Sequence, residues 1–230
     1  MSEQKEKKKK ICIELFSGSG NLSKCLNKND DFKCYTFDIR KRKGICTPDF
    51  KIDISKLKSI QIINLIKNIQ DLKEIKIFAL WIGLPCDVWS YASGGFHWNK
   101  NGTPKTQKCL DHIKLMKHCF KLIEQTKPRY WFIENPRGRL RYNKELINFL
   151  VKNNGMTKQL TMSSYGFGSQ KPTNIFTNYH KLKFKPLDSY GRGNKSAQLF
   201  NNLTVNQRQT YPIEFCEHIT KELKKSTWHF

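Results

Sequence analysis

Short apolar runs alternate with longer stretches of helical spacing along this chain. Four runs are bounded by turn-forming residues and are too short for helices: 11–16, 34–37, 77–82 and 130–133. Four stretches carry apolar residues three or four positions apart, as one face of a helix requires: 21–27, 60–72, 109–125 and 143–153. The alternation predicts an α/β fold in which helices cover both faces of a mostly parallel sheet.

The remaining pattern predicts smaller elements. Residues 50–54 predict a brief third strand, 159–164 and 174–178 two late strands, and 211–223 a C-terminal helix. Residues 91–106 hold Gly, Ser, Asn and Pro with little periodicity, which indicates a long loop. Long loops beside reactive groups often act as lids.

Two strands end in reactive side chains. Cys86 follows Pro85 at the end of one predicted strand, and Glu134 ends another. Because parallel strands end at one edge of a sheet, a nucleophile and an acid/base partner could meet there over one substrate. Two other interpretations stay open: a single cysteine is more often a small buried hydrophobe, and the carboxylate could pair with Arg137 or Arg139.

The first predicted strand leads into a glycine turn and then a helix. Gly18 and Gly20 form that turn, an arrangement typical of nucleotide-binding α/β proteins but equally consistent with a structural turn. Asp38 and Asp53 end the second and third strands, where acidic groups can accept from a ribose and an adenine amino group. A lone Asp there is more often an ordinary turn former. Together the three strand ends point to an adenosine-containing ligand.

The charge balance indicates a polyanionic partner. Lys and Arg number 42 against 19 Asp and Glu, giving a net charge of +23 and a pI near 9.8. We expect a basic flexible tail over 1–10 and one domain over 11–230. Nucleic acid suits this charge better than a membrane surface, since no basic amphipathic helix is evident. The coding bias of an AT-rich genome would explain the lysines, but not the alternate arginines Arg137, Arg139 and Arg141.

The cysteines favour a reducing compartment. The eight cysteines form no C-x-x-C pair and no zinc spacing, and no apolar run is long enough for a signal peptide or a membrane span. We therefore expect free thiols, no metal and no membrane, with the protein in the cytoplasm, the nucleus or a virus factory.

Three segments in order resemble a known family. The segment 14–21 is similar to the cofactor loop of the cytosine-C5 DNA methyltransferases, Gly83-Leu84-Pro85-Cys86 with Ser90 to their catalytic segment, and 132–135 to their Glu-Asn-Val segment. Order and spacing agree over residues 11–136. The resemblance implies a Rossmann-like fold and an enzyme that transfers a methyl group from S-adenosylmethionine to C5 of cytosine in duplex DNA.

The resemblance also implies roles for particular residues. Cys86 would add to C6 of a flipped-out cytosine, Glu134 would hold a proton or hydrogen bond at N3, and residues 91–106 would close behind the base. The residues implied to bind the cofactor are Phe16, Ser17, Gly18, Gly20, Asn21, Asp38, Ile39, Asp53, Ile54 and Pro85. Those implied to contact nucleic acid are Ser90, His97, Arg137, Arg139, Arg141, Lys171 and Thr173. His97 and Trp98 could equally anchor the loop.

The later sequence departs from the family pattern. Residues 170–174 read Gln-Lys-Pro-Thr-Asn, as in compact viral and phage members, where most relatives have Gln-x-Arg-x-Arg. Typical members insert a large target-recognition domain where this chain has only the short stretch 179–210. We therefore expect a minimal insertion and a loose sequence preference, unless a separate specificity subunit reads the target.

Three other functions stay open. The same enzyme could act on RNA, and nothing in the sequence separates the two polymers. A catalytically silent nucleic-acid-binding protein could keep the fold, although the presence of Cys86 and Glu134 argues against it. An enzyme acting on a modified pyrimidine nucleotide would not need so basic a chain.

Overall fold

A computed structural model describes most of the chain: residues 8–39, 46–70, 75–93, 95–187 and 203–226. Two expectations fall partly outside these residues. They are the basic tail at 1–10 and the short recognition insertion at 179–210.

The described residues form a seven-stranded sheet in the order β3-β2-β1-β4-β5-β7-β6. Its strands are β1 (Lys10–Leu15), β2 (Phe32–Asp38), β3 (Phe50–Lys51), β4 (Ile77–Gly83), β5 (Tyr130–Pro136), β6 (Met156–Thr161) and β7 (Pro172–Thr177). The first five pair in parallel, and β7 runs antiparallel to both β5 and β6. The predicted mostly parallel sheet is confirmed.

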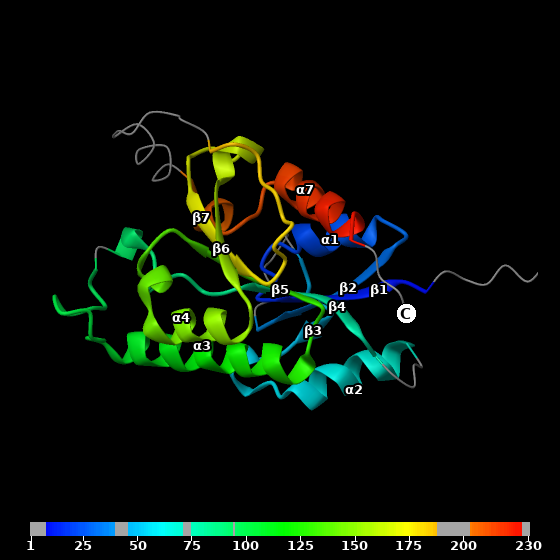
Figure 1. The fold of residues 1–230 in the computed structure, drawn as a ribbon, viewed down its shortest axis with the longest axis horizontal. Helices are drawn as coiled ribbons and strands as arrows, with labels where there is room; N and C mark the ends of the chain where they lie inside the picture. The colour runs from blue at the N-terminus through cyan, green and yellow to red at the C-terminus, as the bar shows by residue number, and fades with distance from the viewer. Residues whose placement is uncertain (1–7, 40–45, 71–74, 94, 188–202, 227–230) are drawn as a thin grey trace, which may run out of the picture.

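Helices cover both faces of the sheet (Figure 1). The α-helices are α1 (Asn21–Asn27), α2 (Ser59–Gln70), α3 (Gln107–Thr126), α4 (Lys144–Lys152), α6 (Val205–Arg208) and α7 (Ile213–Lys224). The 3₁₀ turns are η1 (Ile54–Lys56), η2 (Tyr91–Ser93), η3 (Arg139–Tyr142) and η4 (Met162–Tyr165). In Figure 1, α2, α3 and α4 lie on one side of the sheet and α1 and α7 on the other. Two apolar clusters form the core, one against each set of helices.

Three predicted elements differ from the structure. The third strand ends at Lys51 rather than at 54, because Asp53 caps η1 by accepting from the Ser55 N–H at 3.0 Å. The first late strand lies three residues earlier than predicted, since residues 162–165 turn into η4. The last helix begins at Ile213 instead of Tyr211, which leaves Tyr211 in the preceding connection.

The functional edge of the sheet lies at the carboxyl ends of β1, β4 and β5. Leu15 pairs with Ile82, and Gly83 pairs with Glu134, so these strands end at nearly the same level. Apolar residues fill the strands and the chain turns only after them, which places the following polar residues together at one edge.

Candidate active site

A cavity of about 970 Å³ opens at this edge, within the size range of small-molecule sites. Cys86 and Glu134 both line it, so the thiol and the carboxyl predicted to meet do share one cavity. The other predicted site residues in the lining are Phe16, Ser17, Gly18, Asp38, Ile39, Asp53, Ile54, Pro85, Ser90, Arg137 and Lys171. Gly20, Asn21, His97, Arg139, Arg141 and Thr173 are not in the lining.

One end of the cavity is formed by the loop after β1 and two carboxylates. Gly18 has φ +53°, a conformation that glycine adopts without strain, and its N–H donates to Asp38 Oδ2 at 2.9 Å. Asp53 Oδ1 accepts from the backbone and the hydroxyl of Ser55, whose hydroxyl lowers the pKa of Asp53 most. The backbone turn and the acidic groups fit a ligand with hydroxyl and amino donors, such as adenosine.

Two predicted cofactor residues support this loop from outside the cavity. Gly20 has φ +65°, and a Cβ there would lie 2.7 Å from Cys46 Sγ, so only glycine fits. Asn21 Nδ2 donates to the backbone oxygen of Tyr211 at 2.9 Å. Gly20 therefore lets the loop pack closely against Cys46, and Asn21 connects the loop to the segment before α7.

Cys86 comes three residues after β4. The sheet order puts β4 and β5 on the other side of β1 from β2 and β3, so Cys86 and Glu134 lie toward the opposite end of the cavity. The N–H groups of Trp89 and Ser90 donate to the Cys86 carbonyl oxygen at 3.0 and 2.9 Å, which forms the turn that presents the thiol. Burial raises the pKa of Cys86 to about 11; the carboxyl of Glu134 adds to this shift and the ammonium of Lys171 opposes it. In the ligand-free protein the thiol is therefore protonated near neutral pH.

Glu134 is only 6% exposed, and burial raises the pKa of its carboxyl against the opposing effects of Lys171 and Tyr211. Oε2 accepts from the Tyr211 hydroxyl at 2.9 Å, while Oε1 has no hydrogen-bond partner within the described part of the chain. The alternative of an ion pair with Arg137 or Arg139 is therefore wrong.

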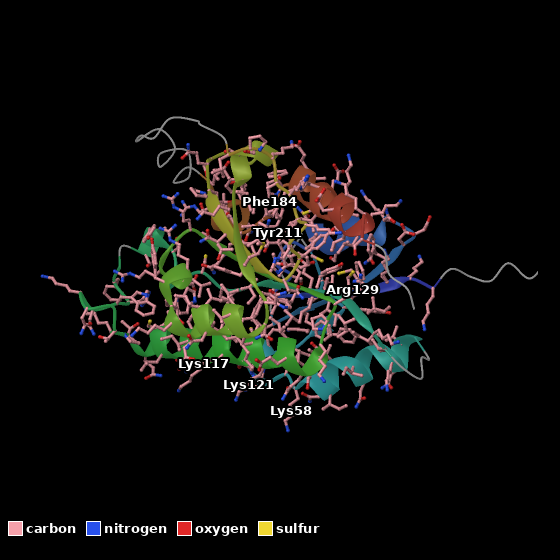
Figure 2. The ribbon with its side chains drawn as sticks, viewed as in Figure 1. Lys58, Lys117, Lys121, Arg129, Phe184 and Tyr211 are labelled. Carbon is pink, nitrogen blue, oxygen red and sulfur yellow. The ribbon has the colours of Figure 1, made fainter. Side chains whose placement is uncertain are left out.

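Tyr211 lines the cavity and contacts Glu134, but the sequence analysis did not single it out because it was assigned to the start of the last helix. It is buried between α7 and the sheet (Figure 2), with its ring 6.0 Å from Trp81 and 5.7 Å from Phe215. A Cβ on Gly83 would lie 3.0 Å from Tyr211 Oη, so this hydroxyl needs a glycine at the end of β4. The only local signals were that glycine and a tyrosine directly before Pro212.

Lys171 and Ser169 lie at the same end of the cavity as Cys86 and Glu134. Lys171 Nζ donates to the backbone oxygen of Arg208 at 2.8 Å and lies 5.1 Å from the centre of the Phe167 ring. Its charge lowers the pKa of both Cys86 and Glu134. Ser169 is 4% exposed, and within the described residues its hydroxyl has no hydrogen-bond partner.

The loop after Cys86 is held by two of its own side chains. His97 Nδ1 lies within hydrogen-bond distance of Thr106 Oγ1, at 2.8 Å, and Trp98 Nε1 donates to the Val88 carbonyl at 2.7 Å. The alternative in which His97 and Trp98 anchor the loop is therefore the one observed.

Other predicted nucleic-acid residues lie beside the cavity. The guanidinium of Arg139 is 5.9 Å from the Trp98 ring, and that of Arg141 is 4.5 Å from the Tyr142 ring. Thr173 is buried, and its hydroxyl donates to the Lys171 carbonyl at 3.0 Å. Thr173 therefore supports the backbone of Lys171 and is not available to a phosphate.

The cavity lining includes further residues that sequence reasoning did not single out. Helix α3 contributes Asp111, His112 and Leu115, and the segment before α7 contributes Arg208 and Gln209. Burial lowers the pKa of His112, which favours a neutral ring. The helical pattern of α3 indicated only its apolar face and not the residues at the cavity.

Among the described residues, no group of three or more His, Cys, Asp or Glu side chains is arranged to hold a metal ion. None of the described helices combines the length and the apolar character needed to cross a bilayer.

Comparisons with known proteins identify a family and related folds. The family model for C-5 cytosine-specific DNA methylase matches residues 11–168. A protein described as a prophage-encoded DNA modification methyltransferase (E. coli) matches at 17% identity and TM-score 0.52, over 78% of this chain and 52% of that one. A methyltransferase of Entamoeba histolytica matches at 17% identity and TM-score 0.53, over 81% and 58%. No curated protein matches.

These two likenesses concern the fold. They confirm the predicted Rossmann-like arrangement of a mostly parallel sheet with helices. The chain spans little more than half the length of either solved structure.

Proposed function

Because the chain belongs to the C-5 cytosine-specific DNA methylase family, we propose that it transfers a methyl group from S-adenosylmethionine to C5 of cytosine in DNA, through a covalent bond between Cys86 and C6. One observation carries the proposal: the Cys86 thiol and the Glu134 carboxyl line a single cavity whose other end is bounded by Asp38 and Asp53. A volume of about 970 Å³ has room for both an adenosine-sized ligand and a pyrimidine.

The first step forms the bond between Cys86 Sγ and C6 of the target cytosine. The thiol gives its proton to solvent water, the sulfur lone pair attacks C6, and the electron pair of the C5–C6 double bond moves into the ring toward N3. Glu134 donates a proton to N3 and thereby neutralises the developing charge. Its burial supports this role, since the raised pKa favours a neutral carboxyl that can act as a donor.

The second step consumes the enamine formed by this addition. S-adenosylmethionine, when bound, supplies the electrophilic methyl group that C5 takes up; the loop 16–18 with Asp38 and Asp53 would hold it. The C5 proton then leaves to a base, the C5–C6 double bond re-forms, and the Sγ–C6 bond breaks to release Cys86. Glu134 recovers its proton from N3.

Lys171 supplies positive charge at the end of the cavity that holds Cys86 and Glu134. Its ammonium opposes the raised pKa of the thiol, so it favours the thiolate that must attack C6. Residues 170–174 lack the two arginines of the family pattern, and Lys171 with the unpartnered hydroxyl of Ser169 is suited to the polar edge of the base in their place.

The proposed polymer is DNA, with the target base flipped out of the duplex. Arg137 is exposed at the cavity, and Tyr91 and Phe96 expose aromatic rings on the loop after Cys86. Exposed aromatic rings and a net charge of +23 suit stacking on bases and attraction of phosphates. We also propose one domain over residues 11–230 and a short, loose target sequence.

Two assays test the function. Tritiated S-adenosylmethionine is supplied with duplex DNA and, in parallel, with tRNA; label in DNA is expected, and label in tRNA alone would assign the RNA substrate instead. Bisulfite sequencing of the DNA product then reports the sequence context. Methylation of one long defined site by the chain alone would contradict the loose preference.

The covalent step has its own test. A duplex with 5-fluorocytosine at the target cannot lose a C5 proton, so the wild type should form an adduct that survives denaturation. Cys86→Ala should form none. Cys46→Ala is the matched control, because Cys46 is half-buried and outside this cavity. An adduct with Cys86→Ala, or none with the wild type on either polymer, would contradict the proposal.

A further inference from the structure

A buried chain of hydrogen bonds ends on Glu134. Trp81 Nε1 donates to Tyr211 Oη at 3.2 Å, and Tyr211 Oη donates to Glu134 Oε2 at 2.9 Å. The three side chains come from β4, from the segment before α7 and from β5, and all are buried. Hydrogen bonds in such an apolar interior hold side chains more firmly than they do in water.

The direction of these hydrogen bonds follows from the donor types. An indole N–H can only donate, so Trp81 occupies a lone pair of Tyr211 Oη. Within the described structure the hydroxyl proton of Tyr211 has no acceptor other than Glu134 Oε2. Oε2 is thus an acceptor whether Glu134 is ionised or neutral, and a proton added to the carboxyl goes to Oε1. Oε1 is the oxygen that lacks a partner among the described residues.

We propose that Tyr211 is a positioning residue that keeps the acidic proton of Glu134 on Oε1, the oxygen left for the target base. This inference rests on the proposed function, since it assigns the atom of Glu134 that donates to N3. Tyr211 acts through Glu134 and transfers no proton itself.

Tyr211 is held independently of its hydroxyl. Its backbone oxygen accepts from Asn21 Nδ2 at 2.9 Å, and its ring packs edge-on against Trp81. Gly83 leaves the space that Oη occupies. Phenylalanine at position 211 would keep the ring and backbone contacts and remove only the donor to Oε2, so Tyr211→Phe tests the hydroxyl alone.

Tyr165→Phe is a matched control. Tyr165 is also buried, packs 5.4 Å from Phe215, and accepts from the Lys185 N–H at 2.8 Å, but Glu134 is not its partner. Both variants lose one buried hydroxyl from the same apolar cluster. A general loss of packing or stability would affect both alike.

The expected result separates rate from binding. Tyr211→Phe should lower kcat about tenfold, the scale of one hydrogen bond to a charged group, with KM for DNA and for S-adenosylmethionine unchanged. The alkaline limb of the kcat–pH profile should move to higher pH, because the Tyr211 hydroxyl lowers the pKa of Glu134 and its loss raises it. Tyr165→Phe should keep the wild-type kcat and the wild-type alkaline limb of the kcat–pH profile.

Two outcomes would overturn this inference without affecting the proposed function. In the first, Tyr211→Phe keeps the wild-type kcat and the wild-type alkaline limb of the kcat–pH profile. In the second, kcat and the melting temperature both fall but the alkaline limb does not move. If the wild type methylates no nucleic acid, the proposed function fails. The inference is then tested by infrared titration of the Glu134 carboxyl, with Glu134→Gln as the blank. A titration at higher pH in Tyr211→Phe supports it, and an unchanged titration overturns it.

Discussion

The two ends of the cavity carry the same functional group, a carboxyl, but its pKa shifts in opposite directions at the two ends. At the loop after β1, Asp53 is partly exposed, and the Ser55 hydroxyl holds the pKa of its carboxyl below the usual value. At the ends of β4 and β5, Glu134 is buried, and burial raises its pKa. An ionised carboxylate accepts hydrogen bonds, whereas a neutral carboxyl can donate a proton. In the function we propose, burial therefore separates a binding role for Asp53 from a catalytic role for Glu134.

The two ends also differ in how the chain builds them. Gly18 and Asp38, which meet at the first end, are 20 residues apart and lie after neighbouring strands. Glu134 and Tyr211, which meet at the second end, are 77 residues apart. We accordingly expect changes at the first end to alter affinity and changes at the second to alter rate.

The largest effect is expected from Glu134→Gln. An amide cannot give a proton to N3, so kcat should fall by about 100-fold or more. The variant should also alkylate faster at Cys86 at alkaline pH, where Glu134 of the wild type is ionised and its carboxylate adds to the raised pKa of that thiol. Kinetics with tritiated cofactor and peptide mass spectrometry after iodoacetamide measure both. An unchanged kcat would place the acid elsewhere.

Lys171→Met should have the opposite effect on the thiol. Without the ammonium the pKa of Cys86 rises further, so alkylation slows, and kcat should fall about tenfold. Lys158→Met is the control, since Lys158 Nζ also donates to a backbone carbonyl, at 3.0 Å, but lies outside the cavity lining. Equal alkylation rates in the two variants would remove Lys171 from the activation of Cys86.

Asp53→Asn should weaken binding with little change in rate. Loss of the carboxylate should raise the Kd of S-adenosylmethionine about fivefold, the scale of one hydrogen bond, while kcat at saturation stays at the wild-type value. Isothermal titration measures the affinity, with Asp31→Asn as a control, since Asp31 pairs with Lys224 and is not in the cavity lining. A lower kcat at saturation would contradict the division between the two ends.

Glu14→Gln is expected to act on stability and not on activity. Burial raises the pKa of Glu14 from 4.5 to about 8, so the folded state binds a proton that the unfolded state releases. Stability should therefore fall as the pH rises from about 5 to about 8. Glutamine keeps an acceptor for the Ser23 N–H and removes this dependence. Urea unfolding at several pH values measures the free energy of unfolding. The same dependence on pH in the variant as in the wild type would contradict the assignment to Glu14.

Sequence reasoning located the local elements of the site well. The helix predicted over 21–27 has those bounds in α1, Cys86 follows three residues after β4, and Glu134 lies in β5, two residues before its end. Turn formers and apolar periodicity act over a few residues, so they can be read without the fold. Asp53 was placed at a strand end but caps η1, because a capping hydrogen bond competes with strand pairing over the same residues.

The α/β class, the two strands beside Cys86 and Glu134 and the basic character of the chain could be predicted from the order of the residues. The antiparallel insertion of β7 between β5 and β6, the contact of Tyr211 with Glu134, and the opposite pKa shifts of the two carboxyls could be found only in the folded protein. The reason is physical: pairing between distant segments and burial depend on the whole packed chain, whereas periodicity and turn formation depend on neighbours in sequence.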